Sequence, residues 1–187
     1  MEPLKLINML ERLFAKLDQL AILHGVQMID TVDGCYIAAT NFVLDQSADH
    51  ARRLASFALA ALSAAGEIAI DAGQPNLGSV NVRAGLHCGA VCGSVLGTHG
   101  GRKHTIVGDA VNIASRMQSQ GAPGTAQCSA AFAALLAKQG GAVKLVQREG
   151  KVAIKGLGPM QTFWIIPPPP GPASSLSALP SQATVAC

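Results

Sequence analysis

The chain has 187 residues, of which 49% are hydrophobic, 13% charged and 4% aromatic, and its formal net charge is +3. This composition excludes an intrinsically disordered chain, and so small a positive surplus does not favour a nucleic-acid-binding protein. The longest apolar run, residues 54–65, is shorter than the ~20 residues that a membrane-spanning helix needs. We therefore expect one globular domain without a membrane segment in this chain, and a cytoplasmic location unless a longer protein attaches it to a membrane.

The N-terminal quarter predicts a helix followed by a hairpin. Leucine and methionine recur at three- and four-residue spacing between Pro3, which suits a first helical turn, and Gly25, which suits a helix end. The segments 26–32 and 35–42 then predict two strands, joined by the Asp-Gly pair at positions 33 and 34 that favours a tight hairpin turn. A second, alanine-rich helix is expected over residues 48–72.

The rest of the chain mixes hairpins with helical crossovers, which predicts an α+β fold with a mostly antiparallel sheet. Its domain spans residues 1–166, and the Pro- and Ser-rich segment 167–187 is predicted to be a disordered tail. The elements expected after the second helix are strands at 80–89, 90–97 and 104–107, a helix within 106–117, a strand at 125–129, a helix at 130–138, and strands at 143–147, 152–156 and 161–166.

Two polar residues interrupt the small, apolar segment 106–117. Asn112 and Arg116 are four residues apart, so they share one face of a helix. A guanidinium binds phosphate oxygens with two parallel hydrogen bonds, and an amide can hold a hydroxyl. The pair therefore suits a phosphoester ligand, although a solvated helix face would carry the same two residues.

Three segments together carry a family resemblance. They are "HTIVGDAVNIASRMQSQGAPG", which contains this helix, "LHCGAVCGSVLG" upstream of it, and "VAIKGLGPMQTFWI" near the end of the domain. In combination they resemble the catalytic domain of class III adenylate and guanylate cyclases, over residues 2–166. The resemblance implies a ferredoxin-like nucleotide cyclase fold that works as a homodimer or as a heterodimer with another cyclase domain, with each active site built from both partners.

The resemblance also implies roles for particular residues. It implies that Asn112 holds the ribose, that Arg116 stabilises the transition state and that Lys155 binds the triphosphate. The family's first purine-selecting position, Glu in guanylate and Lys in adenylate cyclases, falls on Asp30, and the second falls on Thr105. A carboxylate accepts hydrogen bonds from the donors N1 and N2 of guanine, so Asp30 favours GTP over ATP, whereas Thr105 is neutral.

The metal-binding part of the resemblance is incomplete. In the family two Asp residues hold two Mg²⁺ or Mn²⁺ ions, the first on a strand similar to "FSDIVGFT", which has no counterpart in these 187 residues. That strand would lie centrally in the sheet, and its loss should leave edges exposed. The second Asp normally follows Gly as "GDAY", whereas this chain has "DGCY" from Asp33. Asp33 is therefore either a metal ligand or a turn residue, and we expect a partner or a missing segment to supply most of the metal site.

These features predict a purine nucleotide cyclase domain that forms cyclic GMP and pyrophosphate from GTP at a dimer interface, together with a metal-supplying partner. The alternative is a catalytically inactive, cyclase-like regulatory or nucleotide-sensing module. An unrelated phosphate-binding domain that shares only the helix motif is a third interpretation.

Overall fold

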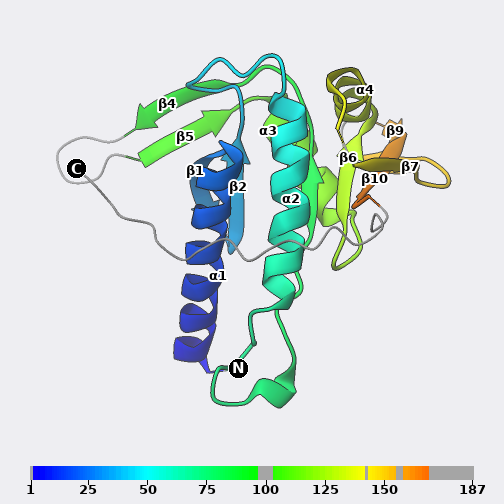
Figure 1. The fold of residues 1–187 in the computed structure, drawn as a ribbon. Helices are drawn as coiled ribbons and strands as arrows, with labels where there is room; N and C mark the ends of the chain where they lie inside the picture. The colour runs from blue at the N-terminus through cyan, green and yellow to red at the C-terminus, as the bar shows by residue number, and fades with distance from the viewer. Residues whose placement is uncertain (1, 97–102, 142, 155–157, 169–187) are drawn as a thin grey trace, which may run out of the picture.

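The computed structural model describes residues 2–96, 103–141, 143–154 and 158–168. Figure 1 shows two long helices in front of the hairpin β1–β2. A larger sheet and a short helix lie to the right of the second long helix. The elements are α1 (Pro3–His24), β1 (Gln27–Val32), β2 (Cys35–Ala39), α2 (His50–Gly66), the 3₁₀ helix η1 (Pro75–Leu77), β3 (Ala84–Leu86), β4 (Cys92–Leu96), β5 (Lys103–Val107), α3 (Asp109–Ser119), β6 (Ala126–Ser129), α4 (Ala130–Gln139), β7 (Lys144–Gln147), β8 (Val152–Ile154), β9 (Gly158–Met160) and β10 (Thr162–Ile166).

The first helix forms as the sequence predicts. Pro3 lies in the first turn of α1, and Gly25 ends the helix in a left-handed conformation with φ of 64°. The helices α1 and α2 run antiparallel and side by side (Figure 1), and leucines of α1 pack against small residues of α2. Within the part of the chain that the structure describes, no helix combines the length and apolar character needed to cross a membrane.

The second helix is shorter than the sequence predicts, because it ends at Gly66 rather than near residue 72. Beyond this point the backbone turns to pair with a distant segment. The N–H of Ile70 donates to the carbonyl oxygen of Gly78 at 3.0 Å, and the N–H of Val80 donates to that of Ile68 at 2.8 Å. These non-local hydrogen bonds replace the ones that a longer helix would make.

The largest sheet has four strands in the order β3-β6-β10-β7. Only the β3–β6 pair is parallel among the strand pairs of the described residues, which confirms the predicted α+β class with mostly antiparallel pairing. The largest core lies between this sheet, α2 and α4, where Phe132 and Leu136 are almost fully buried. The strand predicted at 80–89 is reduced to the three residues of β3. The strand β9, which contains Pro159, was not predicted.

The hairpin β1–β2 packs beside this sheet without joining it. Among the described residues, β2 pairs only with β1, and β3 pairs only with β6. Both strands nevertheless lie against α2, since Tyr36 of β2 packs near Phe57 and Leu86 of β3 packs near Ala55. Among the described residues β2 and β3 each keep an unpaired edge, as the predicted lack of the family's central strand implies. The predicted tail, 167–187, lies outside those residues apart from its first two prolines.

Candidate functional site

The helix α3 presents the predicted polar pair to solvent. Asn112 and Arg116 are both exposed, whereas Ala110 and Met117 are buried on other faces of the same helix. Within the described part of the chain, neither polar side chain makes a hydrogen bond or an ion pair. Both side chains are therefore accessible, and their binding of a ligand stays a prediction.

A glycine lets α3 lie close to the main sheet. A Cβ atom built on Gly85 of β3 would overlap the backbone of Ala114 and Gln118 in α3. Only a residue without a side chain permits this close approach, which brings the backbone of the helix down onto β3. Gly85 thus helps to set the height of α3 above the sheet.

The same helix packs against the hairpin that flanks Lys155. Met117 of α3 and Val152 of β8 form a small core with Ile113 and Met160. Lys155 follows the last residue of β8, but it lies outside the described residues. The structure therefore packs α3, which carries Asn112 and Arg116, against the strand that precedes Lys155, and the roles of all three residues stay predictions.

The two predicted base-selecting residues lie on strands that contact each other. Asp30 is half-buried on β1, just after a register shift in the hairpin, and its Oδ1 accepts a hydrogen bond from the N–H of Thr31 at 2.8 Å. Thr105 is half-buried on β5, opposite Ser94 of β4. Since β1 contacts β5, and β5 leads through Gly108 into α3, the base-selecting strands and the polar helix are continuous in the fold.

Asp33 occupies the hairpin turn and is exposed. Its φ of 51° and the φ of 75° at Gly34 are both positive, as a type I′ turn requires. Among the described residues there is no group of three or more His, Cys, Asp or Glu side chains that could hold a metal ion. Cyclase catalytic domains, which the sequence resembles, generally use divalent metal ions. The residues that the structure describes do not form such a metal site by themselves.

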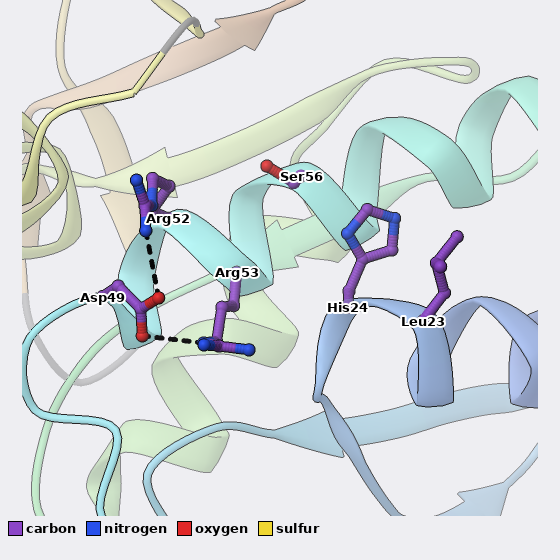
Figure 2. A pocket seen from close by; sticks show the side chains of 6 residues that line it. All are labelled: Leu23, His24, Asp49, Arg52, Arg53 and Ser56. Carbon is purple, nitrogen blue, oxygen red and sulfur yellow. Dashed lines mark hydrogen bonds and ion pairs between the residues drawn. The ribbon is translucent and has the colours of Figure 1, made fainter.

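A surface pocket of about 260 Å³ lies elsewhere, where the end of α1 meets the start of α2. Figure 2 shows Asp49 between Arg52 and Arg53, with His24 approaching from α1. Asp49 accepts hydrogen bonds from Arg53 Nε at 2.7 Å and Arg52 Nη2 at 3.0 Å, and these two partners hold the pKa of its carboxyl below the usual range. The pocket contains none of the predicted site residues, and its single carboxylate is paired with both arginines.

Two residues near α3 were missed by the sequence-based prediction. Gln127 is fully buried in β6, and Arg148 follows β7; Nη1 of Arg148 donates to Oε1 of Gln127 at 2.9 Å. The sequence contained a signal for Gln127, because an amide side chain in the middle of a short buried strand requires a polar partner. Nothing local in the sequence indicates that Arg148 is this partner.

Comparisons with known proteins identify the family. The model of the adenylate and guanylate cyclase catalytic domain matches residues 1–167. The chain is 32% identical over 166 residues to the human guanylate cyclase soluble subunit beta-2; the match covers 88% of this chain and spans about a quarter (25%) of that subunit's length.

Solved structures give the same result. The guanylate cyclase domain of RhGC from Catenaria anguillulae, in complex with GTP, superposes with a TM-score of 0.79 at 27% identity, covering 90% of this chain and 87% of that one. The non-canonical dimeric guanylyl cyclase domain of the RhoGC fusion protein from Blastocladiella emersonii superposes with a TM-score of 0.76 at 25% identity, covering 89% and 86%. The chain belongs to the adenylate and guanylate cyclase catalytic domain family.

Proposed function

We propose that this chain is the substrate-binding half of a guanylate cyclase site, which forms cyclic GMP and pyrophosphate from GTP together with a partner domain. In this reaction the ribose 3′-oxygen forms a bond to the α-phosphorus, the bond from that phosphorus to the oxygen bridging to the β-phosphate breaks, and the hydroxyl proton is released. The observation that carries the proposal is the exposed, unpaired pair Asn112 and Arg116 on a helix anchored in the fold of this family.

Each proposed residue contributes a distinct interaction. The fork of N–H donors on Arg116 would stabilise the negative charge that develops on the phosphate oxygens, and Asn112 would orient the ribose. Lys155 would bind the triphosphate as a point charge. Asp30 would accept hydrogen bonds from guanine, and Thr105 would line the same base-binding region.

The proposal places the metal ions on carboxylates other than those of the described residues. Asp33 alone, exposed in a turn, offers one carboxylate, whereas the resemblance implies two metal-binding Asp residues. A cyclase domain that brings both carboxylates would complete the site, so the active form is a dimer between this chain and such a domain. The related GTP-bound domain and the related dimeric domain described above support GTP and dimerisation.

The test is reconstitution. The full chain is mixed with a cyclase domain that carries both metal-binding aspartates and lacks its own equivalents of Asn112 and Arg116, and cyclic GMP is measured in Mn²⁺. We expect turnover that neither chain shows alone. Arg116→Ala should lower kcat by about 10²–10³, as removal of one preorganised oxyanion donor does. Arg52→Ala, which removes an exposed arginine in α2, is the matched control and should not change kcat.

A nucleotide-sensing module without turnover is the second candidate. It is favoured by the lack of a carboxylate cluster among the described residues. It predicts that the chain binds a non-hydrolysable GTP analogue, or a cyclase partner, and that no cyclic product forms in the same mixture. Calorimetry run beside the turnover assay separates the two candidates, since binding without product rejects the cyclase and product rejects the sensing module.

A further inference from the structure

Arg148 contacts the end of the helix α3. It follows β7 directly, and its Nη1 donates a hydrogen bond to the carbonyl oxygen of Gln120 at 2.8 Å. Gln120 is the residue that ends α3, and its own N–H donates to the carbonyl oxygen of Arg116 at 3.0 Å. Two hydrogen bonds in series therefore connect the guanidinium of Arg148 to the backbone of Arg116.

A second route connects the same two elements through the core. Nη1 of Arg148 also donates to Oε1 of Gln127 at 2.9 Å, and Nε2 of Gln127 lies 3.9 Å from the sulfur of Met117 in α3. Gln127 and Met117 are both fully buried. Because the amide of Gln127 is buried, water cannot cheaply replace Arg148 as its partner, so the arginine supports the packing of Gln127 against Met117 of α3.

The arginine is itself held in place. Its guanidinium carbon lies 5.0 Å above the centre of the Trp164 ring, and its backbone N–H donates to the carbonyl oxygen of Thr162 at 2.9 Å. A cation near the last carbonyls of a helix is also favoured by the helix dipole. Lysine would keep the charge and could donate to the same two oxygens, but it lacks the flat guanidinium that stacks on the Trp164 ring.

We infer that Arg148 is a positioning residue for Arg116: it fixes the C-terminal turn of α3, and through it the direction in which the phosphate-binding guanidinium points. The inference rests on the proposed function. It assigns to Arg148 no contact with substrate. Its effect is on the placement of Arg116, and a misplacement of about 1 Å is enough to cost about 10²-fold in rate.

The experiment compares Arg148→Ala, Arg148→Lys and the control Arg12→Ala in the full chain. Arg12 is a matched control because its Nη2 also donates to a distant carbonyl oxygen, that of Ala69, at 2.9 Å, but from α1. Two quantities are measured: kcat and KM for GTP in the reconstituted mixture, and amide hydrogen exchange of the chain alone.

We expect Arg148→Ala to lower kcat by about 10²-fold with a much smaller change in KM. Arg148→Lys should restore part of this loss, and added guanidinium ion should restore part of it in the alanine variant. Exchange should become faster at the amides of Gln120 and Gly121, whose partners lie in α3, and stay unchanged in α1. Arg12→Ala should leave kcat and exchange in α3 unchanged.

Unchanged kcat in Arg148→Ala would overturn the inference. So would an exchange increase of equal size in every element, since that indicates global destabilisation. If the wild-type mixture makes no cyclic nucleotide, the proposed function fails and exchange decides alone: an increase confined to the end of α3 supports the anchoring by Arg148, and unchanged exchange there rejects it.

Discussion

Gly85 on β3 lies against the backbone of Gln118 on α3, with no space between them for a side-chain carbon. The neighbouring atoms are backbone atoms on both sides, so neither element can yield by rotating a side chain. The close packing of this helix on the sheet therefore requires a residue without a Cβ atom at position 85.

Gly85→Ala should lower the free energy of unfolding by about 1–3 kcal/mol, because the added methyl group forces α3 away from β3. Urea denaturation followed by far-ultraviolet circular dichroism measures this change. Gly66→Ala is the control, since a Cβ atom at Gly66 meets nothing within 4 Å and the residue is the last of α2. Equal stability of Gly85→Ala and wild type would contradict the packing described here.

Asp30→Asn should weaken the preference for GTP. The substitution keeps the shape of the side chain but replaces a charged acceptor by an amide, and hydrogen bonds to charged groups contribute about 1.5–3 kcal/mol. We expect the ratio of kcat/KM for GTP to that for ATP to fall by about 10- to 100-fold in the reconstituted mixture. Asp45→Asn, in an exposed loop, is the control. A ratio that stays constant in Asp30→Asn would show that this carboxylate does not select the base.

Stability should decrease as the pH falls through the range in which His87 would take up a proton. Burial lowers the pKa of His87 below its ordinary value of 6.5, and its Nδ1 lies 2.7 Å from Oγ of Ser129. The unfolded chain therefore binds a proton at a higher pH than the folded chain, so this contribution to stability is complete above pH 6.5 and is lost as the pH falls towards the folded pKa.

The measurement is urea denaturation of wild type and His87→Gln between about pH 5 and 8. The variant should show a smaller decrease of the unfolding free energy at low pH. His24→Gln is run in parallel, because burial lowers the pKa of His24 as well and its contribution has the same sign. Identical pH dependence in wild type and His87→Gln would exclude His87 as a source of the effect.

The cysteines should react with maleimide at very different rates. Cys35 and Cys92 are exposed, whereas burial, with a smaller contribution from nearby Cys88, raises the pKa of Cys128 to about 12. Thiolates are the reactive form, so in the folded chain the exposed cysteines should be labelled first and Cys128 only after unfolding. Mass spectrometry of digested samples in a Cys187→Ser background measures this, and labelling of Cys128 as fast as Cys35 would be inconsistent with its burial.

The elements that the sequence predicts well are those fixed by local rules. Pro3 and Gly25 delimit α1 because one suits a first turn and the other a left-handed end. Asp33 and Gly34 form the hairpin turn for a similar reason, since both adopt positive φ with little strain. The shared face of Asn112 and Arg116 on α3 was also predictable, because it follows from helical spacing alone.

The features that the sequence does not predict depend on partners far away in the chain. The end of α2 at Gly66 is set by hydrogen bonds with residues 78–80, and β9 forms as the partner of β8 despite its glycine and proline. The contact of Arg148 with Gln120 joins positions 28 residues apart in the chain. Periodicity and turn signals carry no information about such pairs, and the placement of Lys155 and of the metal ligands stays a prediction.

The position of α2 between two otherwise separate strand groups has a consequence for local unfolding. Among the described residues, the hairpin β1–β2 and the four-stranded sheet share no ladder, and the alanine-rich helix packs on both. No strand ladder among the described residues joins the hairpin to the four-stranded sheet, so packing on α2 and the contact of β1 with β5 hold these two groups together. We therefore expect the hairpin that carries Asp30 to open locally more easily than the core around Phe132.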